Sequence, residues 1–429
     1  MKEVKVGVIG FGTVGAGVAN CLLKNCDVIA KRCGVKPVLV KVADLDIEKD
    51  RGVNVPRTLL TRDAHELIRE SDIVVELIGG ITKAKDFIIE ALEQGKPVVT
   101  ANKALLAEKG DEIFAAAAKS NADVYFEASV AGGIPVIKAL REGLAGNRIN
   151  RIYGILNGTC NYILTRMERE NVDFWPVLED AQKLGYAEAE PSLDIDGFDT
   201  AHKATILASI AYGKWFGMKP IFVSGIRDIS LADLKYADDL GYRIKLLAVI
   251  KQIEGDVQIR VHPALVPKTA LLANISEVFN GVMINGDTVG DTLFYGRGAG
   301  RDATSSAVVA DIIDICLNIS SGSPRRIPPF REGRQFENIT PMEKITTRYY
   351  IRLQVEDKPG VIAKAAEILA SKGISVSSFI QKEGQSSDNV SVLILTHEAL
   401  EEDVMKAVSE IEKLPSVKEK AKLIRIEDI

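Results

Sequence analysis

The first 130 residues of the chain alternate short apolar runs with longer amphipathic segments. The apolar runs are rich in β-branched residues, as is typical of parallel strands covered on both faces, and they occupy residues 4–9, 38–42, 73–78, 98–99 and 124–126. Between them, apolar positions recur at helical spacing, for example over residues 84–92 and 111–119. This alternation predicts an α/β domain over residues 1–130 with a doubly wound parallel sheet.

The middle of the chain mixes glycine-rich loops with helices and with alternating strands, such as residues 243–250. This mixture predicts an α+β domain over residues 131–320. Its last helix is predicted over residues 301–319, where one apolar stripe contains Val308, Ile312, Ile315 and Ile319. We expect this helix to pack back onto the first domain.

Residues 321–347 have the composition of a linker, because glycine and proline break the helical pattern there. Prolines occur at positions 324, 328, 329 and 341, and the segment also contains Arg325, Arg326, Arg331 and Arg334. Such arginines suit a phosphate contact or a solvated connector, and we favour the connector. From residue 348 to 429 the pattern restarts as strand, helix, strand, strand, helix, strand. This order predicts a compact ferredoxin-like unit tethered by the linker.

A glycine-rich turn follows the first predicted strand and opens the first predicted helix. Its residues are Gly10, Phe11, Gly12, Thr13, Val14 and Gly15. In a Rossmann domain the first glycine of such a turn permits the tight bend, the second lets the backbone approach a pyrophosphate, and the third lets the helix pack on the strand. The helix N-terminus then presents N–H groups to the phosphates. The context predicts a dinucleotide site on a Rossmann doubly wound parallel sheet.

The second predicted strand ends at Asp44, where an acidic residue would accept hydrogen bonds from the adenosine ribose and favour NAD. Lys49, Arg51 and Arg57 follow closely and suit the 2′-phosphate of NADP instead. Asp44 also suits a third role, the capping of a turn. The sequence leaves these alternatives open.

Composition argues against several classes of partner. The 429 residues carry a formal net charge of −5 and no long run of lysine and arginine, so no basic face for nucleic acid is predicted. No uncharged stretch reaches the length of a membrane span, and the N-terminus lacks the apolar core of a signal peptide. We therefore expect a cytoplasmic protein that binds no membrane. Five cysteines without a CxxC pair indicate reduced thiols, not disulfides or a zinc site.

The segment 185–203 places a series of acids before one lysine: Glu188, Glu190, Asp194, Asp196 and Asp199, then Lys203. If the chain is helical after Pro191, Asp196, Asp199 and Lys203 lie on one stripe. A surface ladder of ion pairs is one interpretation. Lys203 lies in an apolar helix, however, where an ammonium is costly unless it is paired or functional. We favour a lysine that passes a proton to a developing alkoxide.

The segment 185–203 is similar to the signature of homoserine dehydrogenase. Matching segments in the same order and spacing extend the similarity to residues 4–320, and they include residues 98–107, 127–135 and 156–164. The last unit resembles the ACT domain, with Asp357-Lys358-Pro359-Gly360-Val361 in the loop after its first strand. The resemblance implies a Rossmann domain, an α+β catalytic and dimerisation domain, and a C-terminal ferredoxin-like ACT domain.

The resemblance implies reversible, NAD(P)-dependent interconversion of L-homoserine and L-aspartate 4-semialdehyde in threonine, methionine and isoleucine biosynthesis. It assigns catalysis to Lys203, the proton donor, and to Lys103, which orients the same oxygen. The implied substrate-binding residues are Glu188, Asp199, Asp194, Tyr186, Gly158 and Thr159. The implied cofactor residues are, besides the glycine turn and Asp44, Thr100, Lys103, Gly185 and Gly298. Gly298 also suits a simple chain reversal.

Further partners follow from the same resemblance. A monovalent cation, Na⁺ or K⁺, would lie at Glu127, Val130, Gly132 and Ile134. A carboxylate and backbone carbonyls would form a hard oxygen site there. An ordinary loop with a buried acid is the alternative. An amino-acid effector, threonine or a related end product, would bind the ACT domain, whose alternative role is chain assembly. A homodimer or homotetramer is implied as well.

Two other functions stay open at this point. Another amino-acid dehydrogenase, such as one acting on aspartate, would share the Rossmann half but has no need for the arrangement from Glu188 to Lys203. A non-catalytic sensor would bind a nucleotide and an amino acid without turnover. We favour homoserine dehydrogenase with a feedback domain, because it accounts for all the matching segments together.

Overall fold

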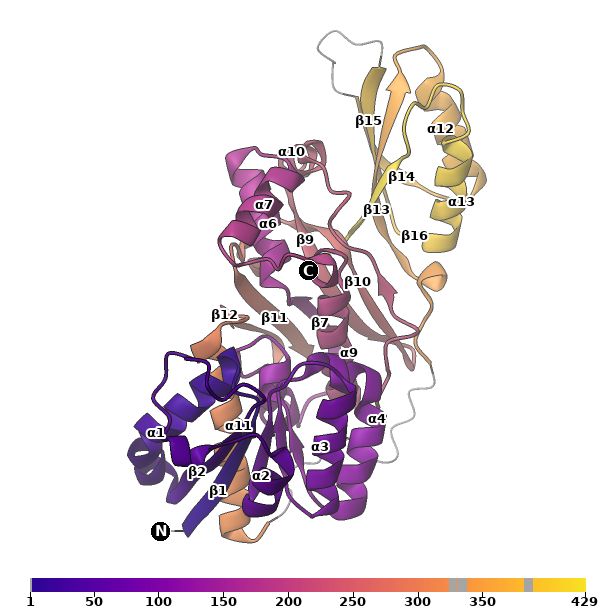
Figure 1. Ribbon diagram of the computed structural model, residues 1–429. Coiled ribbons are helices and arrows are strands. Elements are labelled where there is room, and N and C mark those ends of the chain that lie inside the picture. The colour runs from indigo at the N-terminus through magenta and orange to yellow at the C-terminus, as the bar shows by residue number, and fades with distance from the viewer. Residues whose placement is uncertain (1, 324–329, 331–337, 382–388) are drawn as a thin grey trace.

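The computed structural model describes residues 2–323, 330, 338–381 and 389–429. Three units follow one another along the molecule, with the N-terminal unit at the bottom of Figure 1, the middle unit above it and the C-terminal unit at the top right. The four arginines predicted in the linker, at positions 325, 326, 331 and 334, lie outside the described residues.

The N-terminal unit is the predicted Rossmann domain. Among the described residues its sheet has six strands in the order β3-β2-β1-β4-β5-β6, and every pair is parallel. The strands are β1 (Lys2–Ile9), β2 (Val35–Ala43), β3 (Leu60–Thr61), β4 (Ile73–Glu76), β5 (Val98–Thr100) and β6 (Val124–Tyr125). The helices are α1 (Thr13–Cys33), α2 (Ala64–Glu70), α3 (Thr82–Glu93) and α4 (Lys103–Ser120). The strand order reverses between β1 and β4, where Rossmann domains bind dinucleotides.

Alternate strand residues face two separate apolar cores, as the pleat requires. Val6 and Val8 face the core that contains α1 and the late helix α11 (Arg301–Ser321). Ile9 and Val74 face the core formed with α2, α3 and α4. Helices therefore cover both faces of the sheet (Figure 1).

Helix α11 returns to the N-terminal domain and lies along α1 (Figure 1). The Ser305 hydroxyl donates a hydrogen bond to the carbonyl of Val14 at 3.2 Å, and a Cβ on Gly17 would lie 2.1 Å from that hydroxyl. Within the described residues, α11 alone has the length and composition of a membrane span, and 56% of the stretch is buried. An apolar helix buried in a domain core meets the same criterion.

The middle unit packs helices against a mixed sheet, as the α+β pattern predicts. Its strands are β7 (Ile149–Ile155), β8 (Phe222–Val223), β9 (Tyr242–Ile253), β10 (Asp256–Pro267), β11 (Phe279–Gly286) and β12 (Gly290–Arg297). Its helices are α5 (Val136–Lys138), α6 (Gly158–Glu170), α7 (Phe174–Lys183), α8 (Ser192–Ile195), α9 (Phe198–Tyr212) and α10 (Leu231–Asp239). Gly158 and Thr159 of α6 and Asp199 and Lys203 of α9 line the cleft described below.

The C-terminal unit has the predicted ferredoxin-like order. Its elements are β13 (Thr346–Glu356), α12 (Val361–Ser371), β14 (Val376–Gln381), β15 (Asn389–Thr396), β16 (Ala399–Leu400), α13 (Glu401–Ile411) and β17 (Lys422–Ile426). The four long strands lie in the order β17-β13-β15-β14. Strand β17 also pairs in parallel with β10, through Ala264 opposite Arg425 and Leu265 opposite Ile426. The middle and C-terminal units therefore share one sheet, which has 11 strands in the described residues.

Buried ion pairs reinforce this junction. The Glu427 carboxylate, which is 1% exposed, accepts hydrogen bonds from Arg260 at 2.6 Å and from Lys251 at 2.8 Å. On the other side of the sheet, Asp233 of α10 accepts from Arg352 of β13 at 2.7 Å. The linker is thus not the sole connection between the C-terminal unit and the rest of the chain.

Candidate active site

A cleft of about 660 Å³ lies between the glycine turn and the middle unit. It is lined by predicted cofactor residues, namely Thr13, Val14, Lys103, Gly185 and Gly298. It is also lined by the whole predicted substrate and catalytic set: Gly158, Thr159, Tyr186, Glu188, Asp194, Asp199, Lys103 and Lys203. The fold thus brings both sets together from segments that are up to 285 positions apart, since Thr13 and Gly298 share the cleft.

The glycine turn forms a cradle that side chains would fill. Gly10 has a φ of +102°, and a Cβ on Gly15 would lie 1.9 Å from the carbonyl oxygen of Gly10. A Cβ on Gly12 would meet no atom within 4 Å, so the turn is open where α1 begins. Among the described residues no side chain caps α1, and its first N–H groups are available to an anion. A pyrophosphate fits this cradle.

The second glycine loop closes the cleft opposite this cradle. A Cβ on Gly298 would lie 2.1 Å from the side chain of Asn280, and a Cβ on Gly132 would lie 2.5 Å from the Gly298 backbone. Close approach of backbone to backbone therefore demands glycine at position 132, whereas a side chain at position 298 would displace Asn280. The loop is consequently more than a chain reversal, because it lies against Gly132 and lines the cleft.

Lys203 lies on α9 and is buried, with a side chain 10% exposed. Its ammonium donates to the carbonyl of Leu156 at 2.7 Å and to Oδ2 of Asp199 at 2.6 Å. Two of its three protons are thus held by acceptors in the described chain, and the third is free for an oxygen atom in the cleft. Burial lowers the pKa of Lys203, although the charge of Asp199 partly offsets this effect.

Asp199 is buried between two lysines. Its Oδ1 lies 2.7 Å from Nζ of Lys103, and its Oδ2 accepts from Lys203. Burial alone would raise the pKa of Asp199, but the two ammonium groups hold it well below its usual range. Burial would lower the pKa of Lys103, yet Asp199 and neighbouring acids raise it overall. Asp199 therefore lies between the two lysines and fixes both at the cleft wall.

The single acidic stripe predicted after Pro191 is wrong in one respect. Gly197 adopts a φ of +91° and separates α8 from α9, so no continuous helix joins Asp196 to Lys203. Asp196 accepts a hydrogen bond from Arg227 at 3.0 Å and does not line the cleft. Asp194 and Asp199 instead approach the cleft from two separate helices.

Asn157 joins these two acids and was given no role by the sequence analysis. Its amide nitrogen donates to Asp194 at 2.8 Å and to Asp199 at 2.9 Å. Its carbonyl oxygen caps α6 by accepting from the N–H of Cys160. The available signal was an N-cap residue type, asparagine, immediately before the segment that forms α6. The Leu156 carbonyl that binds Lys203 carries no signal in the sequence.

The remaining predicted substrate residues form the outer wall of the cleft. The Thr159 hydroxyl donates to the carbonyl of Tyr186 at 2.7 Å, which ties the start of α6 to the loop that contains Gly185. The Tyr186 ring is 47% exposed and packs against Tyr162. Glu188 is exposed at the cleft margin. This arrangement leaves a polar, acid-rimmed entrance.

Three predicted groups lie away from the cleft wall. Thr100 is fully buried and donates to Glu76 at 2.6 Å, so its hydroxyl supports the sheet edge and does not face the cleft. Asp44 accepts from the N–H of Phe11 at 2.6 Å and from that of Asp46 at 2.9 Å, which is the turn-capping alternative. Of the candidate cation residues, Gly132 alone reaches the cleft; Glu127, Val130 and Ile134 are buried behind it.

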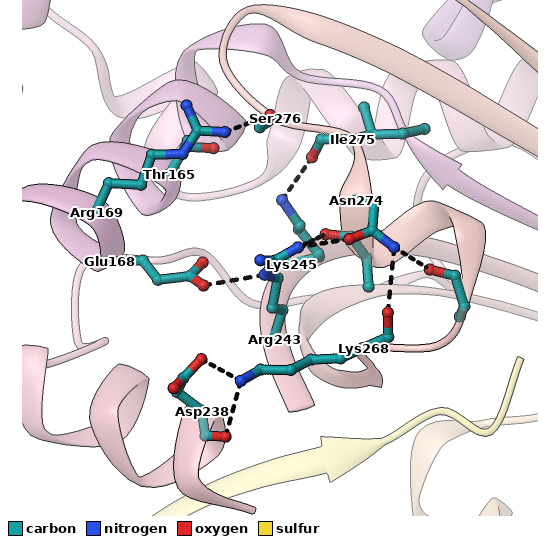
Figure 2. A network of polar contacts seen from close by, with 12 residues as sticks. Thr165, Glu168, Arg169, Asp238, Arg243, Lys245, Lys268, Asn274, Ile275 and Ser276 are labelled. Atoms are coloured by element: carbon teal, nitrogen blue, oxygen red, sulfur yellow. Dashed lines mark hydrogen bonds and ion pairs between the residues drawn. The ribbon is translucent and has the colours of Figure 1, made fainter. Parts of the chain in front are cut away.

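A network behind the cleft holds α6 to the loop that precedes β11 (Figure 2). Lys245 of β9 is 2% exposed and donates to the Asn161 side chain at 3.0 Å and to the Ile275 carbonyl at 2.6 Å. Asn161 in turn donates to the carbonyls of Glu277 and Phe279. The intervening residue Val278 lines the cleft, and its carbonyl would lie 2.8 Å from a Cβ on Gly158. The network therefore fixes one wall of the site.

Family models of known proteins match most of the chain. The family model described as homoserine dehydrogenase matches residues 135–313, that described as its NAD binding domain matches residues 10–127, and the ACT domain model matches residues 349–416. The chain is 45% identical to the homoserine dehydrogenase of Neisseria gonorrhoeae and 35% identical to that of Bacillus subtilis, covering 100% of this chain in both cases and 100% and 99% of those chains.

Solved structures give the same result. A crystal structure of a homoserine dehydrogenase from Thiobacillus denitrificans superposes with a TM-score of 0.95 at 43% identity, covering 100% of this chain and 99% of that one. A hyperthermophilic archaeal homoserine dehydrogenase in complex with NADPH has a TM-score of 0.62 at 29% identity, covering 74% of this chain and 98% of that one.

Proposed function

This chain belongs to the homoserine dehydrogenase family, and we propose that Lys203 moves the proton of its reaction. The protein is an oxidoreductase that interconverts L-homoserine and L-aspartate 4-semialdehyde with a nicotinamide cofactor. The predicted function is confirmed, and the aspartate dehydrogenase and the non-catalytic sensor are set aside. The roles of individual residues below are proposals.

The nicotinamide cofactor, when bound, supplies the hydride that reduces the aldehyde carbon. Lys203 provides the proton for the oxygen, because Asp199 and Leu156 hold its ammonium and leave one proton for the cleft. Its lowered pKa eases release of that proton, and in the reverse direction the neutral amine accepts the proton of the homoserine hydroxyl. This single arrangement is the observation that carries the proposal.

Lys103 and the acids bind the substrate around this centre. Lys103 stays charged beside Asp199 and stabilises the developing negative charge on the same oxygen. Because Asp199 is saturated by two lysines and Asn157, the substrate ammonium is bound by Glu188 and Asp194. Gly158, Thr159 and Tyr186 shape the pocket for the amino-acid backbone.

NADP(H), which carries a 2′-phosphate on its adenosine ribose, fits the ribose end of the cofactor site near Asp44 better than NAD(H) does. Both Asp44 oxygens are already used by backbone N–H groups. Arg51 lies 3.7 Å from Asp44 with a side chain 16% exposed, and its buried Nε has no partner among the described residues. Such a guanidinium suits a phosphate.

A monovalent cation fits behind Gly132. Glu127 and Asp311 are both buried there, 3% and 5% exposed, and burial raises the pKa of Glu127 to about 7 despite N–H donors from Ile137 and Lys138. Backbone carbonyls of Val130, Gly132 and Ile134 would complete an oxygen site that offsets this charge. The cation would support the hinge between the domains and take no part in the chemistry.

Regulation and assembly complete the proposal. An amino-acid end product, threonine first among candidates, would bind the ACT domain and inhibit the enzyme. We place the enzyme in the cytoplasm as a homodimer or homotetramer, consistent with five free cysteines.

Replacement of Lys203 tests the central role. Lys203→Ala should lower kcat about a hundredfold or more while the affinity for NADPH, measured by fluorescence titration, changes little. The control is Lys183→Ala, which removes a surface lysine 71% exposed and should leave both values unchanged. Near-normal turnover of Lys203→Ala would refute the proton role.

A further inference from the structure

We propose that Asn157, the N-cap of α6, is a positioning residue that fixes Asp194 and Asp199 relative to the Lys203 ammonium. The inference rests on the proposed roles of these three residues. Asn157 itself is 5% exposed, although it lies at the cleft wall. Its role follows from its hydrogen bonds to the two acids, not from a contact with substrate.

Every polar side-chain atom of Asn157 is used. The two N–H groups of its amide donate hydrogen bonds to different carboxylates, to Oδ1 of Asp194 at 2.8 Å and to Oδ2 of Asp199 at 2.9 Å. The amide oxygen accepts from the N–H of Cys160 at 2.8 Å and so fixes the amide plane to the start of α6. One side chain therefore sets the relation between α6, α8 and α9.

The Asp199 carboxylate depends on this contact for its orientation. Its Oδ2 receives Lys203 and Asn157 together, which leaves Oδ1 for Lys103 at 2.7 Å. The residue before Asn157, Leu156, holds the same Lys203 ammonium through its carbonyl. Two consecutive residues thus fix both members of the Lys203 and Asp199 pair, and the remaining ammonium proton keeps one direction.

The amide also separates two like charges. Asp194 faces Asp199 and Lys203 from α9 and Lys103 from α4. Burial and then the charge of Asp199 raise the pKa of Asp194, whereas the hydrogen bond from Asn157 lowers it. Without that donor, Asp194 gains its proton at a higher pH and loses its attraction for a substrate ammonium.

The test separates amide donation from helix capping. Asn157→Ser keeps an oxygen that caps α6 but removes both donors, and kcat/KM for homoserine should fall about tenfold to a hundredfold. In the pH profile of kcat/KM for this variant, the acid limb should move to higher pH. Asn157→Asp also keeps an oxygen that caps α6, and its acid limb should shift in the same direction. It replaces the serine variant in the test if that variant does not fold. A wild-type acid limb in the folded variants overturns the proposal.

The matched control lies one helical turn further along α6. Asn161→Ser removes an equally buried amide that donates to the Glu277 and Phe279 carbonyls, so it should lower the melting temperature without moving the acid limb. A shift of the limb in this variant would show a general structural effect and overturn the inference. Lys203→Ala in the same series decides the proposed function separately: normal turnover there refutes the proton role, whatever Asn157→Ser shows.

Discussion

Arg51 and Asp44 lie together after the second strand, at the proposed ribose end of the cofactor site. The Asp44 carboxylate is committed to the N–H groups of Phe11 and Asp46, whereas Arg51 keeps a buried Nε without a partner in the described chain. Arg51→Gln should therefore lower kcat/KM for NADPH about tenfold to a hundredfold, because a charged hydrogen bond to phosphate is lost. In the same variant, kcat/KM for NADH should change less than about twofold.

Steady-state kinetics with both cofactors checks this prediction, and Arg57 provides its control. Arg57 pairs with Glu48 at the surface, with a side chain 68% exposed, so Arg57→Gln should affect neither cofactor. An equal loss for NADPH and NADH in Arg51→Gln would contradict the assignment. Asp44 would then be the residue that binds the ribose, which is one of the alternatives that the sequence left open.

At this scale, sequence reasoning identified charged side chains but not their geometry. Lys203 stood out because an ammonium in an apolar helix needs a reason, and the structure places it at the cleft wall. Asp196 shared its acidic context yet pairs with Arg227, because Gly197 turns the chain at a φ of +91°. The Leu156 carbonyl was beyond prediction, since every residue has a backbone carbonyl and only the fold selects one.

Elements behind the site show how a buried charge stabilises a wall of the cleft. Burial lowers the pKa of Lys245 to about 8. Its hydrogen bond to Asn161 joins β9 to α6, and its hydrogen bond to the Ile275 carbonyl joins β9 to the loop before β11 (Figure 2). Lys245→Met should lower the free energy of unfolding by about 2 to 4 kcal/mol, because two buried acceptors lose their donor. Denaturant unfolding at pH 7 measures this difference.

The same variant has a defined pH dependence. Below pH 8 Lys245 is protonated in both the folded and the unfolded state. Between pH 8 and the ordinary lysine pKa of 10.5, the unfolded chain binds a proton that the folded chain does not. Wild-type stability relative to Lys245→Met should therefore rise with pH in that window, by up to about 1.4 kcal/mol per unit. Lys268→Met is the control, because Lys268 is 35% exposed and pairs with Asp238 at the surface. A pH-independent difference would exclude titration of Lys245.

The order of elements was predictable because local patterns encode it. Period-two and helical spacing gave the Rossmann order and the ferredoxin-like order, and both are observed. The pairing of β17 with β10 was not predictable, since it joins residues such as Leu265 and Ile426 that are distant in sequence. Edge strands present unpaired backbone groups to any compatible strand, and sequence does not name the partner.

The whole molecule is continuous across this junction. The C-terminal unit extends the catalytic sheet, and β8 pairs with the same edge of β10 as β17 does, because β9 pairs along the opposite edge. In the loop after β8, a Cβ on Gly225 would lie 2.0 Å from the carbonyl oxygen of Ile195. Ile195 is the neighbour of Asp194. Backbone hydrogen bonds therefore connect β17 of the ACT domain, through β10 and the loop after β8, to Ile195 beside Asp194. A ligand that favours one arrangement of the junction would have this path to the cleft.

Removal of residues 348–429 should therefore cost stability as well as end-product inhibition. The truncated chain leaves β10 as an open edge and deprives Arg260, 1% exposed, and Lys251 of the Glu427 carboxylate. The point variant Glu427→Gln isolates the charge: it leaves two cations without their anion and should lower the free energy of unfolding by about 3 to 5 kcal/mol. Calorimetry of both proteins, with kcat measured in the presence and absence of threonine, checks these outcomes.

Acid titration gives the sign of the Glu427 contribution. Burial alone would raise the pKa of Glu427, but Arg260 and Lys251 hold it at about 2, below the ordinary value of 4.5. The stabilisation is therefore present above pH 4.5 and lost as the pH falls toward 2, so wild type and Glu427→Gln should converge in that range. Asp428→Asn is the control. The Asp428 side chain is 58% exposed, so its ion pair with Arg348 contributes less than about 1 kcal/mol to the free energy of unfolding. A truncated chain that melts at the full-length temperature would show that the C-terminal unit is only tethered, and the shared sheet would then play no part in stability.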